Sequence, residues 1–343
     1  MRRRERDDGD TECIDMFMTR WPLQPRNRRH RWFGLAFALI LLLSAAPAVA
    51  LEIWFAPVDH LKRADRLKNQ DFPDLFNEPP GWNTRVDVFK IAPFFAAKAT
   101  EQDLRRVADF VKRHRMRLAV AVQPTQVTNE CALGEGRVRP RQNLKMFSRL
   151  HALGVDVAYI GLDEPLTFAH YPRQDPRPCL FPIPEVARRV AATIAEIRQF
   201  YPDAKVVDFE YPSITRPANW AADLKLWLDE YKAATGTPLY AVVLDVNWRE
   251  PWADWVRPSI EVLHRNGVKA GMFLTIAGPG TSDEGAVASL RDNIQAVDAA
   301  NLRLDLEILA TWTFFPTRSL PASDPRTLTS VLDWYLQRRG RGQ

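Results

Sequence analysis

The chain has 343 residues, with 47 Lys and Arg against 42 Asp and Glu and a formal net charge of +5. The first 50 residues hold nine arginines and six acids, which leaves 38 basic and 36 acidic side chains in the rest of the chain. That remainder is close to neutral, so the composition gives no support to nucleic acid as a partner. Its length is enough for one large domain.

The first 50 residues predict a leader that is not part of the fold. Arg28, Arg29 and Arg31 precede an apolar run at 33–43, and a stretch of small residues ends at Ala50. A basic flank, a short apolar core and an Ala-x-Ala ending describe a secretory signal peptide. We expect cleavage after Ala50 and export to the periplasm or the extracellular space. An uncleaved leader is the alternative and would be the only contact with a membrane, although its core is shorter than the roughly 20 residues that a span needs.

Eight short apolar runs follow within residues 51–343, and each is of a length typical of a buried strand. They begin near Leu51, Val86, Leu118, Val157, Val206, Tyr240, Ala270 and Leu306. Strict alternation of strand and helix patterns, without a long polar linker, predicts a single (β/α)8 barrel. The rival is a doubly wound sheet, which usually has a glycine-rich turn after its first strand when it binds a dinucleotide. The turn here reads FAPVDH and contains no glycine.

Amphipathic helix patterns separate these runs. Thr100 offers an N-cap to the first of them, with an acid three residues later. A proline stands near the start of three others, as is normal for a first helical turn. The predicted helices cover residues 100–114, 186–200, 219–234, 252–266, 283–300 and 328–338. Two further segments, 61–69 and 142–153, have a less regular pattern.

The stretch at 157–165, VAYIGLDEP, ends an apolar strand in two adjacent acids. Pro165 cannot donate to a strand ladder and stops the strand there. In a parallel barrel the carboxyl ends of the strands form the rim that carries the active site. We therefore expect Asp163 and Glu164 at that rim, with Asp163 pointing into the barrel.

Two other runs have the same form, VVDFEYP at 206–212 and VVLDVNW at 242–248. If the face toward the helices is apolar, alternation along the strands turns Glu210, Asp245 and Asn247 into the barrel. These acids would then meet those of the fourth strand at one mouth.

Paired carboxylates at a barrel mouth suit glycoside hydrolysis. One acid protonates the leaving oxygen while another attacks the sugar or activates water, and repulsion between them separates their pKa values. Aromatic side chains at strand ends offer flat faces to a sugar ring. These are Trp54, Tyr211, Trp248 and Trp312.

The order of these features resembles the (β/α)8-barrel glycoside hydrolases, especially the clan whose fourth strand ends in Asn-Glu-Pro. The resemblance rests on Asp163, Glu164 and Pro165 and covers the rest of the chain only as architecture. It implies that Glu164 is the acid/base, that Asp163 replaces the Asn that touches the sugar, and that Trp312 is a platform for the ring.

The chain departs from that clan at strand seven, where the clan places its nucleophilic Glu. Here the strand ends in TIAGPGTSDE, and Glu284 is expected to begin a helix. The second carboxylate must then be Glu210 or Asp245. We favour Glu210 because its side chain is longer, while Asp245, with Asn247 on its own face, resembles a substrate-positioning pair.

Cys131 and Cys179 are the cysteines that remain after the leader, and they follow strands three and four. Loops after neighbouring strands share a rim, so we expect a disulfide between them in an oxidising compartment. The sequence contains no zinc-type Cys/His spacing, phosphate-binding loop or GxSxG motif and implies neither metal nor cofactor. The expected partner is a saccharide. A saccharide-binding or envelope scaffold protein without catalysis is the alternative, and a lyase or isomerase is a weaker one.

Overall fold

A computed structural model describes the chain over residues 50–59, 71–77, 82, 85–172, 177–278 and 280–341. The predicted leader and the predicted helix at 61–69 lie outside the described residues. Within them, no helix has both the length and the hydropathy to cross a membrane.

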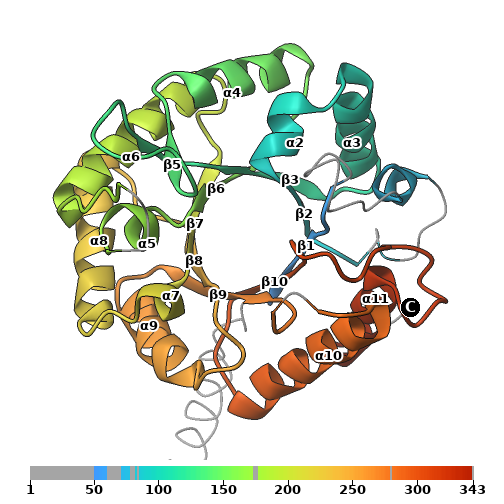
Figure 1. The fold of residues 1–343 in the computed structure, drawn as a ribbon. Coiled ribbons are helices and arrows are strands. Elements are labelled where there is room, and N and C mark those ends of the chain that lie inside the picture. Colours follow the sequence, from blue (N-terminus) through green and yellow to red (C-terminus); the bar gives the residue numbers. More distant parts are fainter. Residues whose placement is uncertain are drawn as a thin grey trace, which may run out of the picture. The chain divides into compact units, whose positions relative to one another are not determined.

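Eight parallel strands close into a barrel in the order β1-β10-β9-β8-β7-β6-β3-β2 (Figure 1). Each strand pairs with its neighbour in the chain, and β1 also pairs with β10, which closes the ring. The strands are β1 (Glu52–Ala56), β2 (Val88–Ile91), β3 (Arg117–Val122), β6 (Tyr159–Asp163), β7 (Lys205–Glu210), β8 (Ala241–Leu244), β9 (Lys269–Leu274) and β10 (Leu306–Ala310). The predicted (β/α)8 barrel is confirmed.

Helices surround the barrel as an outer ring (Figure 1). The long ones are α3 (Glu101–Arg113), α4 (Gln142–Ala152), α6 (Ile183–Arg198), α8 (Trp220–Thr235), α9 (Ala253–Arg265), α10 (Asp283–Ala300) and α11 (Leu328–Arg338). Shorter ones are the 3-10 helix η2 (Phe72–Phe76), α2 (Pro93–Lys98), α5 (Pro165–Ala169) and α7 (Pro212–Thr215). Thr100 caps α3 as predicted, accepting a bond from the Asp103 N–H.

A second, two-stranded sheet stands outside the barrel and was not predicted. It joins β4 (Thr125–Gln126) to β5 (Arg137–Val138), in the segment between β3 and α4. This segment carries Cys131, which forms a disulfide with Cys179, their Cα atoms 4.9 Å apart.

The barrel interior is filled by side chains, and its N-terminal end is closed by a polar cluster around Glu52. The Trp54 indole N–H donates to Glu52 at 2.6 Å, and the hydroxyl of Tyr240 donates to it at 3.0 Å. Arg117 forms an ion pair with the same carboxylate at 3.3 Å. A buried carboxylate is tolerated because it is both paired and hydrogen-bonded.

The expected orientation of β7 is wrong. Val207 and Phe209 belong to the cluster inside the barrel, so Asp208 and Glu210 point outward toward the helices. The register agrees, because Phe209 lies beside Asp163 of β6. The prediction assumed that the helix-facing side must be apolar, whereas here helices offer hydrogen-bond donors to both acids. For Asp208 the donor is the Trp227 indole of α8, at 2.7 Å.

Candidate active site

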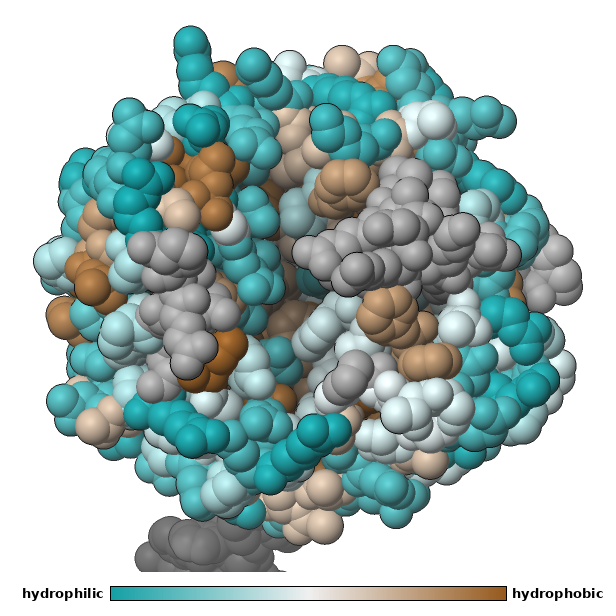
Figure 2. Space-filling model, viewed as in Figure 1, coloured by the Kyte–Doolittle hydropathy of each residue, from teal (hydrophilic) through white to brown (hydrophobic). Residues whose placement is uncertain are grey.

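A cavity of about 560 Å³ lies at the C-terminal end of the barrel strands. Figure 2 shows the hollow near the centre of the face that is seen in Figure 1. Its volume is within the range of small-molecule sites. Its acidic lining residues are Asp59, Glu135, Asp163, Glu164 and Asp245, and Lys90 is the basic residue among the described lining.

Glu164 follows β6 directly and is the first residue outside the strand. Its backbone is left-handed, with φ 50° and ψ 51°, and its N–H donates to the Phe209 carbonyl at 3.0 Å. A residue with a side chain rarely adopts this conformation, and such strain is often found at functional sites. The turn brings the side chain to the cavity. There the Oε2 atom is closed off from solvent and has no hydrogen-bond partner among the described residues.

Burial, reinforced by repulsion from neighbouring acids, sets the electrostatics of Glu164. Burial, and after it the charges of Asp163 and Asp245, hold the pKa of the Glu164 carboxyl well above its usual range. Glu135 and Glu210 act in the same direction. A carboxyl in this setting gives up its proton less readily than an exposed one, which suits a general acid.

Asp245 follows β8 and points into the barrel, as predicted. It is 8% exposed and accepts a hydrogen bond from the Val246 N–H at 2.8 Å. Burial raises the pKa of Asp245 to about 7, the Val246 bond lowers it, and the charge of Glu135 raises it further. Asp245 is therefore ionised only from neutral pH upward.

Glu210 lies behind the barrel wall rather than in the cavity. Its carboxylate accepts bonds from the Leu166 N–H at 2.7 Å, from the Thr167 N–H at 2.9 Å and from the Thr167 hydroxyl at 2.6 Å. Burial raises the pKa of Glu210 to about 8, while these donors lower it. The side chain ties the first turn of α5 to β7, and this turn directly follows Glu164.

Glu135 was not predicted. It lies between β4 and β5 and reaches the cavity because Gly136 packs directly on the end of β6. A Cβ at Gly136 would lie 2.8 Å from the Cβ of Phe168 and 3.1 Å from the Asp163 carbonyl oxygen, and its φ is +73°. Only glycine fits such an approach without strain. The disulfide at Cys131 fastens the same segment.

Aromatic side chains form part of the cavity wall, as the sequence suggested for Tyr211 and Trp312. Trp312 is 38% exposed, and its ring meets that of Phe273 edge-on with centroids 5.5 Å apart. Phe94, which was not predicted, is 48% exposed at the same cavity. The Lys90 amine lies 5.2 Å from the centre of an interior phenyl ring.

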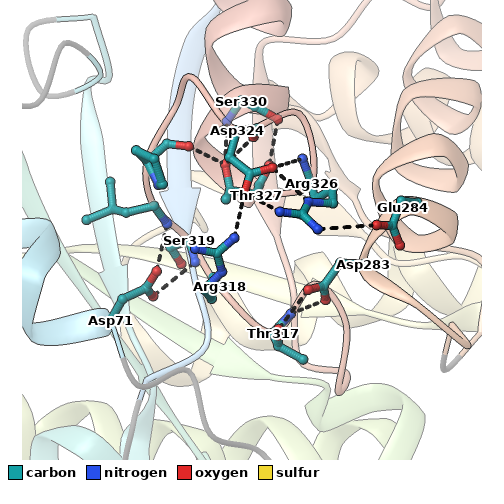
Figure 3. Close-up of polar contacts among 12 residues, drawn as sticks. Asp71, Asp283, Glu284, Thr317, Arg318, Ser319, Asp324, Arg326, Thr327 and Ser330 are labelled. Carbon is teal, nitrogen blue, oxygen red and sulfur yellow. Dashed lines mark hydrogen bonds and ion pairs between the residues drawn. The ribbon is translucent and has the colours of Figure 1, made fainter.

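The loop that follows Trp312 is held in place by several acids (Figure 3). Asp71 accepts hydrogen bonds from two backbone N–H groups of this loop, at 3.0 and 2.8 Å. Asp283, in the first turn of α10, accepts from the Thr317 N–H at 2.6 Å and from its hydroxyl at 2.8 Å. The long connection to α11 is therefore ordered by specific contacts, which favours a fixed position for Trp312.

Three of the expected substrate-binding residues lie elsewhere. Trp54 is fully buried in the barrel core, beside Glu52. Asn247 donates to Glu250 at 2.8 Å, within the loop after β8. The Trp248 indole donates to Thr275 at 2.9 Å. None of the three is among the described residues that line the cavity.

Across the described ranges, no three His, Cys, Asp or Glu side chains are grouped so that they could hold a metal ion.

Comparison with known proteins does not assign the chain to a family. No family model matches the chain, and no curated protein matches it. Among solved structures, a GH10 endoxylanase from a sugarcane soil metagenome has a TM-score of 0.45 and 12% identity over 77% of this chain and 85% of that one. The GH53 catalytic domain of Ignisphaera aggregans has a TM-score of 0.45 and 11% identity over 83% and 98% of the two chains. A D-psicose 3-epimerase has a TM-score of 0.42 and 13% identity over 76% and 84%.

These structures are similar to the chain as barrels. At such identities and TM-scores the similarity carries no conclusion about activity, which must be argued from the site itself.

Proposed function

We propose that this protein is a glycoside hydrolase that cleaves a saccharide in the acidic cavity at the barrel mouth. The observation that carries the proposal is the state of Glu164. Its strained backbone places a carboxyl in the cavity, its Oε2 atom has no described partner, and its pKa lies well above the usual range. These are the properties of a carboxylic acid that donates a proton to a substrate oxygen.

Glu164 is the general acid, and its proton passes to the glycosidic oxygen as the bond from that oxygen to the anomeric carbon breaks. Asp245 is the partner carboxylate, since it lines the cavity and its charge acts on Glu164. It either attacks the anomeric carbon or takes a proton from the water that does so. Glu210, the partner favoured from the sequence, becomes a residue that positions Glu164 through α5.

The pH dependence follows from these two groups. Asp245 must be ionised, which requires a pH near or above its pKa of about 7. Glu164 must be protonated, which its raised pKa favours. A bell-shaped activity profile is the expected result, with its acidic limb set by the Asp245 pKa of about 7.

Binding of the saccharide completes the proposal. Trp312 is the platform for a sugar ring and Asp163 accepts hydrogen bonds from its hydroxyls. The protein acts outside the cytoplasm after loss of residues 1–50, a proposal that rests on the leader pattern and is consistent with the Cys131–Cys179 disulfide.

The test is the release of reducing ends from a panel of polysaccharides by the purified protein and by Glu164→Gln. The variant should lose 10²–10⁴-fold in turnover, the usual contribution of a general acid, while it still binds the substrate. Asp203→Asn, an exposed acid remote from the cavity, is the matched control. Wild-type turnover in Glu164→Gln would remove the catalytic assignment. Binding of glycans with no cleavage of any would favour the saccharide-binding protein.

A further inference from the structure

Large hydrophobic side chains that remain exposed gather at the cavity. Seven such side chains occur in the part of the chain that the structure describes, and three of them line this one cavity. These three are Phe94, Ile214 and Trp312, which are 48%, 42% and 38% exposed. Single exposed hydrophobic residues are common on proteins, but a group of them around a hollow indicates a binding site. The cavity therefore offers apolar contact to a ligand at several points.

Two of these side chains are placed by short helices that follow strands. α2 begins with Pro93 after β2 and buries Phe95, so the neighbouring Phe94 is turned away from the core. α7 also begins with a proline, after β7, and carries Ile214. Tyr211, between β7 and α7, lines the cavity as well. A proline in the first turn limits the directions in which a helix can leave its strand, which gives both side chains a defined position.

The apolar residues occupy opposite sides of the mouth. In the ring of strands, β2 and β10 are the two neighbours of β1, and β7 is four places from β1 in either direction (Figure 1). Phe94 follows β2 and Trp312 follows β10, whereas Tyr211 and Ile214 follow β7. A ligand that contacts both groups must therefore extend across the mouth.

The two proposed catalytic carboxyls flank the line between these groups. Glu164 follows β6 and Asp245 follows β8, and β6 and β8 are the two neighbours of β7. Both carboxyls line the cavity together with the residues that follow β7. A saccharide chain that lies across the mouth thus passes between them, with sugar rings on both sides of the bond that is cleaved.

The size of the cavity agrees with several linked rings. Its volume of about 560 Å³ is typical of a site for a drug-sized molecule, which corresponds to about two or three sugar rings. A monosaccharide would leave one of the two apolar groups uncovered. The hollow opens on the face shown in Figure 2, so a longer chain has room to continue outside it.

We propose that the cavity binds an internal segment of a saccharide chain, which the protein cleaves as an endo-acting hydrolase. Rings on one side of the cleaved bond contact Phe94 and Trp312, and rings on the other side contact Tyr211 and Ile214. The inference rests on the proposed function for the chemistry and adds the class of substrate, a polymer bound away from its ends. Each event breaks one glycosidic bond, consumes one water and converts one chain into two shorter saccharides.

Binding is measured first, because it does not depend on cleavage. The probes are the dimer and the hexamer of six glycans: β-1,4-linked glucose, xylose, mannose and N-acetylglucosamine, β-1,3-linked glucose and α-1,4-linked glucose. Isothermal titration calorimetry uses full-length Glu164→Gln, so that no probe is consumed. We expect at least one hexamer to bind about tenfold more tightly than its dimer, because the dimer covers only one of the two apolar groups.

Two variants, made in the same background, test the two sides of the mouth separately. Phe94→Ala and Ile214→Ala should each weaken binding of that hexamer about three- to tenfold, because each removes one apolar contact. Phe94→Tyr keeps the ring and should bind the hexamer normally. Leu226→Ala is the matched control, because Leu226 is 41% exposed on α8 and is not among the described residues that line the cavity. It should leave hexamer binding unchanged.

The second measurement is the product pattern of the wild-type protein. Size-exclusion chromatography of a cleaved polysaccharide should show that the mean chain length falls early, while few reducing ends have been released. Release of only a mono- or disaccharide from chains that stay long would overturn the inference. Equal affinity for dimer and hexamer in all six series, or no binding of any hexamer, would do the same. So would a loss of affinity in only one of the two alanine variants, since binding would then be confined to one side.

These outcomes are separable from those of the proposed function. A preference for the hexamer that both alanine variants reduce, without cleavage of any polysaccharide, supports the binding mode and contradicts the hydrolase. Cleavage from chain ends without a preference for the hexamer supports the hydrolase and contradicts the inference.

Discussion

Replacement of Asp245 by Asn should stabilise the protein at alkaline pH, at the expense of its activity. Asp245 is 8% exposed, and its carboxylate accepts a hydrogen bond from the Val246 N–H. Asn has nearly the same shape, and its side-chain oxygen can accept the same bond. The substitution therefore removes the buried charge and leaves the packing in place.

The magnitude follows from the pKa. Burial raises the pKa of Asp245 from 3.8 to about 7 in the folded protein. The folded state thus binds the proton more tightly than the unfolded state, so this group favours folding below pH 4 and loses that contribution as the pH rises through 7. A pKa change of this size corresponds to at most about 4 kcal/mol at pH 8. About 2–3 kcal/mol of it should develop between pH 5 and pH 8.

The assay is urea denaturation of wild type and Asp245→Asn at both pH values. The stability difference between the two proteins should shift in favour of the variant by that 2–3 kcal/mol on going to pH 8. Asp203→Asn, an exposed acid, should show no such change. A difference that is the same at pH 5 and pH 8 would refute the reasoning, since it would mean that Asp245 ionises in the folded protein as easily as in the unfolded chain.

Two further predictions concern the supports of the site. Glu210→Gln should keep turnover within about tenfold of wild type, because Glu210 lies outside the cavity. The loss expected for Glu164→Gln is 10²–10⁴-fold. An equal loss for Glu210→Gln in kinetic assays would mean that Glu210 belongs to the catalytic pair. Replacing Cys131 and Cys179 together by Ser should lower the free energy of unfolding by about 4 kcal/mol, the chain-entropy value for their separation of 48 residues. Unchanged urea denaturation in that double variant would contradict it.

The barrel could be predicted because its signals are local and repeated. Each strand is a short apolar run, and most of the long helices have an apolar stripe, four of them with a start signal, so errors at single positions do not change the number of predicted elements. The predicted helices at 283–300 and 328–338 agree with α10 and α11. The extra sheet of β4 and β5 escaped prediction because two-residue strands have no periodicity to detect.

The orientation of β7 could not be predicted from alternation alone. Both of its faces contain apolar residues, and the acids could be satisfied inside the barrel or outside it. What decides is the space available inside: Gly161 of β6 leaves room for the Phe209 ring, and a Cβ there would come within 2.4 Å of it. Asp208 and Glu210 then face the helices, where Trp227 and the first turn of α5 supply donors. These partners are far apart in the sequence.

Asp59 and Glu135 were missed for a related reason. Both follow strands in irregular segments, where a single-residue shift changes which side chain reaches the mouth. Glu135 had one usable signal, because it lies four residues after Cys131 in a loop already expected at the rim. Its place in the cavity depends on the contact of Gly136 with β6, which no local pattern reveals.

The arrangement around Glu164 is difficult to explain as packing. A left-handed glutamate, an acceptor without a described partner and a ring of carboxyls are each unfavourable, and they occur together. They persist because rigid elements hold them in place. Glu210 fixes the first turn of α5, Gly136 packs on the end of β6, and the disulfide at Cys131 fastens the adjoining loop. A preorganised site requires contacts of this kind, which hold unfavourable groups in place. A ligand then meets charges that need no rearrangement.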